Sequence, residues 1–378
     1  MNRTNNKKKR VVFLFSDTGG GHRSAAEAII EALHLEFPDT FICDMVDFFT
    51  EYAPPPFQWA GPSYPIMSRM TYLWWLAFHI SDDPDRMRVL YSSLWPYIRQ
   101  QMHKLIKDQP CDMMVSVHPL VNIPILRALK DRRIPYIIVV TDLVSTHAAW
   151  YTNDADMVII PTQQAARKAS AAHMQPEKLR IVGLPVAHDF CQPIGERSML
   201  RKELQWDQDT MTTLLVGGGE GMGPLEEIAK SINKANIPIN MAIVAGRNKK
   251  LKHDLEQYHW NKKVYVYGFV RNMPDLMRAA DVLITKAGPG TISEAFIAGL
   301  PIILYHRIPG QEEGNVSYVT DEGAGVWAPE TEDIVKTLSD WVDHPEARLE
   351  AAEKAKKLAR PQAACDIAGI IAEKLDSK

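Results

Sequence analysis

Short runs of apolar, mostly β-branched residues recur along the chain and alternate with longer stretches of helical character. A run that is apolar at every position is typical of a strand that is buried on both faces of a parallel sheet. Alternation of such runs with helices predicts an α/β fold with doubly wound parallel sheets. The expected strands cover residues 11–15, 113–117, 136–140, 157–160, 213–216, 241–245, 264–267, 282–285 and 302–305.

The length of 378 residues predicts two domains, each with its own buried core. Residues 185–197 are rich in Pro, Gly and charged residues, and a new unit of strand and glycine loop begins at Thr212. We therefore expect an N-terminal domain over residues 1–195 and a C-terminal domain over residues 196–360. The apolar spacing from Pro345 onward is helical, and residues 361–378 are expected to form a helix that packs back on the body.

Composition excludes several classes of protein. The chain is 46% hydrophobic and 24% charged, which is the balance of an ordinary folded protein. A net charge of −3 provides no global basic field, so a nucleic-acid partner is not expected. No apolar stretch approaches the roughly 18 residues that span a bilayer. The scattered residues Cys43, Cys111, Cys191 and Cys365 form no C-x-x-C pair, which indicates free thiols in a reducing cytoplasm.

Residues 53–80 interrupt the α/β pattern with five prolines and a cluster of aromatic residues, Tyr72, Trp74, Trp75 and Phe78. Aromatic residues at helical spacing pack into a core in many proteins. The alternative is an exposed apolar loop or short helix that touches lipid. Both interpretations are compatible with the sequence.

The first expected strand runs directly into a glycine loop, S-D-T-G-G-G-H-R-S at residues 16–24, and then into a helix. Gly20 and Gly21 allow the backbone to turn sharply and to approach a ligand, and the N–H groups at the helix start favour negative charge. His22 lies on this loop, beyond the carboxyl end of a parallel strand, where such sheets bind ligands. The placement favours a functional His22, although a structural histidine is the alternative.

A second glycine loop, G-G-G-E-G-M-G-P at residues 217–224, follows the first strand of the second domain. Gly218 and Gly219 are candidates for close approach to a phosphate or sugar, and tight turns are the structural alternative. With one such loop per domain, we expect the ligand to bind between the two domains.

Two further loops of the second domain carry polar chemistry. The segment T-K-A-G-P-G-T-I-S-E-A at residues 285–295 combines a strand end, a rigid turn and a helix start, an arrangement that holds diphosphates. Glu294, one helical turn further on, is suited to paired hydrogen bonds from ribose hydroxyls. Amides and carboxylates gather at residues 307–315, as a sugar site requires, although a solvated charged loop is the alternative.

Five motifs in order resemble those of the monogalactosyldiacylglycerol synthases and, more distantly, processive diacylglycerol glucosyltransferases and the lipid II-forming transferase. They are S-D-T-G-G-G-H-R at 16–23, G-G-G-E-G-M-G-P at 217–224, F-V-R-N-M-P at 269–274, K-A-G-P-G-T-I-S-E-A at 286–295 and P-G-Q-E-E-G-N at 309–315. The resemblance implies a GT-B fold with two Rossmann-like domains facing across a cleft. It also implies an inverting glycosyltransferase that moves a hexose, galactose favoured, from a UDP-sugar to the sn-3 hydroxyl of diacylglycerol.

The resemblance also implies residue roles. His22 resembles the general base for the acceptor hydroxyl, a function that suits an imidazole near neutral pH. Glu294 resembles the ribose ligand. The diphosphate cradle maps to Gly288, Pro289, Gly290 and Thr291, the backbone edge for uracil to Phe269, Val270 and Arg271, and the sugar contacts to Gln311, Glu312 and Asn315.

The expected partners are UDP-galactose or UDP-glucose, diacylglycerol and anionic membrane lipids. We expect no cofactor and no metal, because the triplet at Asp83 to Asp85 is a weak signal and backbone amides can stabilise a diphosphate. The long chloroplast targeting extension of plant relatives is missing, which predicts a bacterial-type protein on the cytoplasmic face of the cell membrane. Basic residues Lys7 to Arg10 would add charge attraction to that surface.

Two other functions use related features. A UDP-sugar epimerase also has two α/β domains but needs no lipid acceptor, which leaves the aromatic cluster unexplained. A nucleotide-binding regulator would leave the His22 loop and the loop at 307–315 unused. Galactose and glucose differ by one epimeric hydroxyl, and the sequence does not separate a galactosyltransferase from a β-glucosyltransferase.

Overall fold

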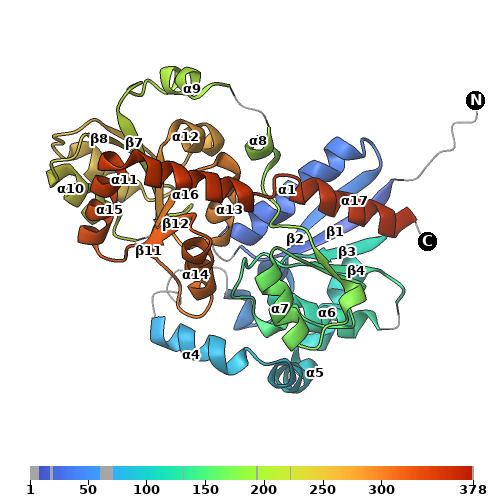
Figure 1. Cartoon of the computed structure of the whole chain (residues 1–378). Helices are drawn as coiled ribbons and strands as arrows, with labels where there is room; N and C mark the ends of the chain where they lie inside the picture. The colour runs from blue at the N-terminus through green and yellow to red at the C-terminus, as the bar shows by residue number, and fades with distance from the viewer. Residues whose placement is uncertain are drawn as a thin grey trace, which may run out of the picture. The chain divides into compact units, whose positions relative to one another are not determined.

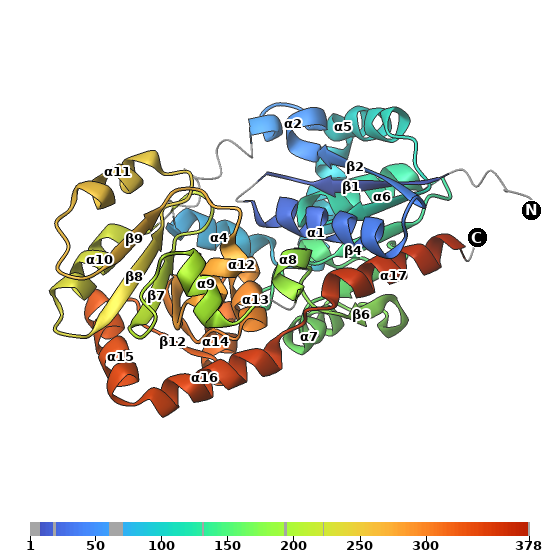
Figure 2. The same cartoon turned by 90° about the horizontal axis from the view of Figure 1, so that it is seen from above.

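The computed structural model describes residues 8–17, 20–59, 71–130, 132–192, 195–221 and 223–376. Contacts between Cα atoms divide the chain into two compact units. The first comprises residues 1–188, 309–311 and 362–378, and the second comprises residues 189–308 and 312–361. Each unit contains its own six-stranded sheet with helices packed against it (Figures 1 and 2).

The sheet of the first unit has the strand order β2-β1-β3-β4-β5-β6, and all of its neighbouring pairs are parallel. The chain order reverses between β1 and β3, which makes the carboxyl ends of these two strands the topological switch point where α/β sheets bind ligands. The strands are β1 (Lys9–Phe15), β2 (Phe41–Asp47), β3 (Met113–Ser116), β4 (Tyr136–Val139), β5 (Met157–Ile160) and β6 (Leu179–Ile181).

Alternate side chains of β1 enter two separate cores, because successive residues of a strand point to opposite faces of the sheet. Val11 and Phe13 pack with residues of α1 and α17, whereas Val12 and Leu14 pack with residues of α5 and α6. The helices are α1 (Gly21–Glu36), α2 (Phe48–Tyr52), α4 (Thr71–Ser81), α5 (Pro84–Asp108), α6 (Asn122–Leu129), α7 (Gln163–Ala171) and α17 (Ala363–Asp376), with short 3₁₀ turns at Phe57–Trp59, Pro119–Val121, Ala148–Trp150 and Pro176–Lys178.

The sheet of the second unit has the order β12-β11-β10-β7-β8-β9, again with parallel pairing throughout. Its switch point lies between β7 and β10. The strands are β7 (Met211–Val216), β8 (Ile239–Val244), β9 (Val264–Tyr267), β10 (Val282–Lys286), β11 (Ile302–His306) and β12 (Gly325–Trp327). The helices are α9 (Arg197–Glu203), α10 (Leu225–Lys234), α11 (Lys249–Gln257), α12 (Met273–Ala279), α13 (Pro289–Ala298), α14 (Glu313–Asp321), α15 (Thr331–Asp343) and α16 (Pro345–Leu358), and the short α8 (His188–Cys191) connects the two units.

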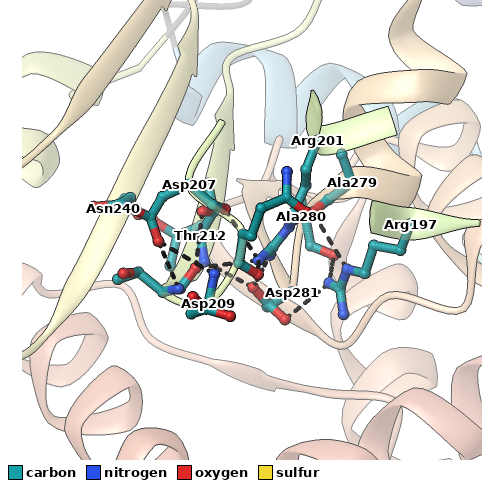
Figure 3. A network of polar contacts seen from close by, with 12 residues as sticks. Arg197, Arg201, Asp207, Asp209, Thr212, Asn240, Ala279, Ala280 and Asp281 are labelled. Atoms are coloured by element: carbon teal, nitrogen blue, oxygen red, sulfur yellow. Dashed lines mark hydrogen bonds and ion pairs between the residues drawn. The ribbon is translucent and has the colours of Figure 1, made fainter. Parts of the chain in front are cut away.

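A buried carboxylate fastens α9 to the second unit. Asp281 accepts hydrogen bonds from Arg201 at 2.6 Å and from the backbone N–H of Thr212 at 2.7 Å, and it forms an ion pair with Arg197 at 2.8 Å (Figure 3). Both arginines also donate to carbonyls at the end of α12, where the helix dipole favours positive charge. Arg348 of α16 adds a third guanidinium at 3.1 Å. This network ties α9 and α16, which are far apart in the sequence, to the residue that directly precedes β10.

The nine strands expected from apolar runs are present, and three further strands, β2, β6 and β12, are not apolar runs. All three lie at the edge of a sheet. An edge strand is only partly covered, so it tolerates the exposed and polar residues that hide it from a pattern search. Ile42 of β2 illustrates this, because it is 48% exposed. The helical segment from Pro345 is two helices, α16 and α17, which belong to different units.

Candidate active site

His22 lies in the first turn of α1, directly after the glycine loop that follows β1. Gly20 caps this helix with a φ of 79°, a left-handed conformation that favours glycine. A Cβ atom placed on Gly20 or on Gly21 would meet no atom within 4 Å. The left-handed conformation thus explains why residue 20 is glycine. Crowding by neighbours explains neither glycine, because the space beside both is open.

The ring of His22 is oriented by the ends of β3 and β4. Its Nδ1 atom lies 2.8 Å from the Oγ1 atom of Thr141, and the Thr141 hydroxyl donates to the Val117 carbonyl at 3.3 Å. In the tautomer that matches both contacts, Nδ1–H of His22 donates a hydrogen bond to Oγ1 of Thr141 while the Thr141 hydroxyl donates to Val117. The neutral ring then carries its lone pair on Nε2, which is the atom that can accept a proton from a substrate.

Burial keeps the His22 ring neutral. Desolvation lowers the pKa of His22 from its ordinary value of 6.5 to about 4, and a hydrogen bond to the Val117 backbone acts in the opposite direction. The ring of His118 packs edge-on against His22 with 4.7 Å between the centroids, and the ring of Trp150 lies 6.3 Å away. Burial also lowers the pKa of His118 well below its usual range, so the pair is uncharged at neutral pH.

Sequence analysis missed three residues around His22. His118 follows β3, Thr141 follows β4, and Asp142 accepts a 2.6 Å hydrogen bond from Nε1 of Trp150. The predicted strands 113–117 and 136–140 contained the signal, because residues just beyond the carboxyl ends of parallel strands meet at one edge of the sheet. Only the strand order shows that these two ends are close to the end of β1.

In the second unit, two glycine loops approach one lysine. Gly218 has a φ of 73°, and a Cβ atom on it would lie 3.7 Å from Cε of Lys286. A Cβ atom on Gly288, the N-cap of α13, would lie 2.9 Å from Nζ of the same lysine. The predicted residues Gly218 and Gly288 are therefore brought together at the switch point of this sheet, around a lysine that sequence analysis did not single out.

Arg247 joins the glycine loop at 217–224 to the segment after β9. The Arg247 guanidinium lies 4.7 Å above the ring of Phe269 and donates to Glu220 at 2.6 Å, and its Nη1 would lie 3.5 Å from a Cβ atom on Gly219. The Phe269 side chain is 56% exposed, Arg271 is exposed, and Val270 is half-buried. Phe269 and Gly219 thus share Arg247 as a contact.

The start of α13 offers unpaired backbone donors. The helix begins at Pro289, and no side chain caps its first turn, which also contains Gly290 and the half-buried Thr291. Glu294 is half-buried one turn further on, and desolvation raises the pKa of its carboxyl from 4.5 to about 7. A carboxyl with this pKa changes its charge near neutral pH, as functional groups often do.

The polar loop at 307–315 is held by its own side chains. Glu312 is buried and accepts hydrogen bonds from Nζ of Lys286 at 2.7 Å and from the Ile308 backbone N–H at 2.8 Å. Asn315 is buried and donates to the Ala287 carbonyl at 2.9 Å. Gln311 belongs to the segment grouped with the first unit, and its Oε1 atom is buried without a hydrogen-bond partner among the described residues.

The aromatic segment forms α4, of which Tyr72 is 71% exposed and Trp75 is 37% exposed. Phe78 is half-buried and packs edge-on against His147, with 4.9 Å between the ring centroids. The side chain of Trp74, residues 60–70 and Lys7 lie outside the described part of the chain. Among the described residues, no helix combines the length and the hydropathy that a membrane span requires.

Of the basic residues near the N-terminus, Lys8 pairs with Asp39 at 2.8 Å and Arg10 with Asp44 at 2.6 Å. Asp83, in the acidic triplet, caps α5 by accepting from the backbone N–H groups of Asp85 and Arg86. In the described ranges no three His, Cys, Asp or Glu residues gather closely enough to hold a metal ion.

Comparison with known families gives two matches along the chain. Residues 22–186 match the family "Monogalactosyldiacylglycerol (MGDG) synthase", and residues 212–367 match the "Glycosyltransferase family 28 C-terminal domain". A probable monogalactosyldiacylglycerol synthase 3 of rice, Oryza sativa subsp. japonica, is 38% identical over 375 residues, which cover 96% of this chain and 74% of that protein. The family expected from the five motifs is confirmed.

Solved structures confirm the fold class, GT-B with two Rossmann-like domains. Acinetobacter baumannii MurG aligns with a TM-score of 0.65 at 16% identity and covers 97% of this chain and 99% of its own. A UDP-GlcNAc 2-epimerase from Neisseria meningitidis aligns with a TM-score of 0.59 at 14% identity, over 98% of this chain and 100% of its own. Glycosyltransferases and epimerases thus share this fold, and the fold alone does not choose between them.

One expectation is wrong. The sequence predicted a bacterial-type protein on the cytoplasmic face of the cell membrane. The rice relative and similar relatives from Arabidopsis thaliana and Spinacia oleracea are chloroplastic enzymes of plants, which contradicts that location. The prediction rested on the length of the N-terminus, and the position where a sequence begins carries no information about the compartment of the folded protein.

Proposed function

Because the chain belongs to the monogalactosyldiacylglycerol synthase family, we propose that it transfers galactose from UDP-galactose to the sn-3 hydroxyl of diacylglycerol. The observation that carries the proposal is the orientation of His22. Its Nδ1 lies within hydrogen-bond distance of Thr141, and in the tautomer that carries the proton on Nδ1 the neutral ring would present Nε2 as the proton acceptor. A transfer to a hydroxyl requires such a base.

In the proposed reaction the hydroxyl oxygen of diacylglycerol attacks the anomeric carbon on the face opposite the leaving group. The bond between that carbon and the β-phosphate oxygen breaks, and a β-glycosidic bond forms with inversion. The hydroxyl proton passes to Nε2 of His22, and UDP leaves with the bonding electron pair. One base and one stabilised leaving group are sufficient for this step, and the proposal includes no cofactor or metal.

The second unit supplies the proposed nucleotide site. Gly288, Pro289, Gly290 and Thr291 would hold the diphosphate at the uncapped start of α13, where the amides and the helix dipole favour negative charge. Glu294 would accept hydrogen bonds from the ribose hydroxyls, and the backbone of residues 269–271 would pair with uracil. The backbone at the two glycine loops would come close to the substrates, at Gly20, Gly21, Gly218 and Gly219. The proposed contacts to the sugar are Gln311, Glu312 and Asn315.

Diacylglycerol is insoluble in water, so the enzyme must meet it at a lipid surface. The exposed aromatic residues of α4, Tyr72 and Trp75, would provide apolar contact. Lys8 and Arg10 are already paired with aspartates, which reduces the charge they can offer to anionic lipids. We therefore assign the larger share of lipid attachment to α4 and a smaller, salt-dependent share to basic residues.

An epimerase remains the competing activity, because structures of that class share the fold. Its reaction inverts a carbon within the sugar and needs no hydroxyl acceptor. The purified chain would be incubated with UDP-galactose or UDP-glucose, with and without diacylglycerol vesicles, and lipids and nucleotide sugars would be analysed by mass spectrometry. We expect β-galactosyldiacylglycerol only when UDP-galactose and diacylglycerol are both present.

Three other outcomes would contradict the proposal in different ways. Glucosyldiacylglycerol as the main product would make the chain a glucosyltransferase. Isomerised nucleotide sugar without lipid would make it an epimerase. Nucleotide binding without any product would make it a regulator, provided that circular dichroism shows a folded protein.

A further inference from the structure

A buried ion pair lies at the carboxyl end of β10. Nζ of Lys286 is 2.7 Å from Oε1 of Glu312, and the side chains are 22% and 4% exposed. The second oxygen of Glu312 accepts the Ile308 N–H, so both oxygens of this carboxylate have partners. An ammonium group has three donors, and the carboxylate of Glu312 uses one of them.

Two glycines lie beside the lysine. A Cβ atom on Gly288 would come within 2.9 Å of Nζ, closer than real Cβ contacts, and one on Gly218 would sit 3.7 Å from Cε. Gly288 is the N-cap of α13, and its φ of −72° is available to any residue. Its backbone conformation therefore does not require glycine, and the short distance shows that Nζ of Lys286 lies directly beside the start of α13.

We propose that Lys286 is the cation that binds the diphosphate of the donor substrate, and that Glu312 acts through Lys286 as a positioning residue. The uncapped amides of α13 and the ammonium group lie at the same helix start, and both favour the same anion. This assignment rests on the proposed function and changes one detail of it, because Glu312 then orients the lysine rather than contacting the sugar.

The role follows from the charge balance of the transfer. When the bond between the anomeric carbon and the β-phosphate oxygen breaks, the electron pair stays on that oxygen, and UDP carries one more negative charge than the bound diphosphate ester. A cation fixed beside that oxygen stabilises the developing charge. Its fixed position matters because a mobile lysine would have to be reoriented during the reaction.

Binding of uridine, UDP and UDP-galactose by calorimetry tests the lysine. Lys286→Gln should weaken UDP binding about ten- to a hundredfold, the usual worth of a charged hydrogen bond, and should leave uridine binding unchanged. Lys286→Arg, which keeps the charge, should restore part of the loss. Lys230→Gln, which breaks a part-buried ion pair with Glu226 on α10, is the control and should change the binding of neither uridine nor UDP.

Glu312→Gln separates the two roles of the carboxylate, since UDP has no sugar. A positioning role predicts weaker binding of both UDP and UDP-galactose, whereas a sugar contact predicts weaker binding of UDP-galactose alone. If Glu312 acts through Lys286, the double variant should lose no more UDP affinity than Lys286→Gln. Glutamine can still accept from the Ile308 N–H, which favours a folded variant.

Two results would overturn the assignment: equal UDP affinity in wild type and Lys286→Gln, or a loss in that variant that is the same for uridine and UDP. Thermal unfolding of each variant identifies losses that come from misfolding. The proposed function fails separately. A wild type that binds UDP through Lys286 but makes no galactolipid would retain this inference and refute the transferase.

Discussion

Oγ1 of Thr141 lies 2.8 Å from Nδ1 of His22, and the Thr141 hydroxyl donates a hydrogen bond to the Val117 carbonyl at 3.3 Å. The hydroxyl of Thr141 therefore selects the tautomer of His22, although the two residues are separated by 119 positions in the sequence. The base that we propose is thus a pair, with one residue that takes the substrate proton and one that fixes where the lone pair lies.

Replacement of the base should abolish transfer without affecting nucleotide binding. We expect His22→Ala to lose about two to four orders of magnitude in kcat, the usual worth of a general base, and to bind UDP as the wild type does. Turnover of radiolabelled UDP-galactose on diacylglycerol vesicles measures the first quantity, and calorimetry the second. A folded variant with near wild-type turnover would show that another group takes the proton.

Loss of the orienting hydroxyl should reduce the rate through the tautomer. Thr141→Val keeps the shape of the side chain but removes the acceptor, and we expect kcat to fall at least about tenfold. Thr141→Ser keeps the hydroxyl and should retain most of the activity. Equal rates for the valine and serine variants would contradict the orienting role.

The acidic limb of the pH profile should lie far below neutrality. Burial lowers the pKa of His22 from 6.5 to about 4, so the base remains unprotonated until the pH falls toward 4. We expect kcat/KM, which reports the free enzyme, to show no loss near pH 6.5 from this group. The unfolded chain binds this proton first, so folding stability should fall as pH drops from 6.5 toward 4. Circular dichroism at each pH separates unfolding from protonation of His22. An inflection in kcat/KM at pH 6.5 would contradict the prediction, because it would show that the imidazole keeps its ordinary pKa.

Ribose binding should be coupled to proton release at Glu294, whose pKa is raised to about 7 by desolvation. Ribose hydroxyls donate to the ionised carboxylate, so uridine affinity should rise from pH 5.5 to pH 7.5 and then level off. Uridine is the suitable probe because it lacks phosphates that titrate near pH 6. Calorimetry in buffers of different ionisation enthalpy measures the proton released.

The matched variant for this prediction is Glu294→Gln, which should bind uridine more weakly and without pH dependence. Relative to the wild type with an ionised Glu294, the binding free energy of uridine should be less favourable by roughly 1.5 to 3 kcal/mol, the worth of a charged hydrogen bond. The raised pKa also means that ionised Glu294 opposes folding, so the wild type should lose stability as the pH rises from about 4.5 to about 7 and then level off, and the variant should not. If the uridine affinity of the wild type does not change with pH, Glu294 does not contact the ribose.

Lipid attachment should depend on the aromatic residues of α4. We expect the double change Tyr72→Ser and Trp75→Ser to reduce flotation with diacylglycerol vesicles while UDP binding is unchanged. Anionic lipid should increase flotation of the wild type, and high salt should decrease it only in part, because Lys8 and Arg10 are paired. Leu349→Ser, at an apolar residue of α16 that is 56% exposed, is the control. Undiminished flotation of a folded double variant would place the lipid contact elsewhere.

Most of the strands that sequence analysis located are central strands with a uniform, buried environment. β10, for example, lies between β7 and β11 and is buried on both faces. Val282, Leu283 and Ile284 are therefore apolar, and the hydroxyl of Thr285 donates a hydrogen bond to the Val216 carbonyl. β2 has sheet on one side only, and its sequence carries Asp44 and an exposed Ile42, which weaken the apolar pattern. A pattern search therefore finds every central strand, and of the four edge strands it finds only β9, whose sequence V-Y-V-Y is apolar or aromatic throughout.

The sequence by itself determined the α/β class, the family and the loops that carry the chemistry, because these depend on local patterns: apolar runs, glycines and the order of five motifs. Tertiary structure decided which side chains act on one another. Thr141 and His118 beside His22, and Lys286 between Gly218 and Gly288, come together only because parallel strands from distant segments end at one sheet edge. Protonation states were decided there too, since desolvation depends on everything that packs around a group and not on its neighbours in the chain.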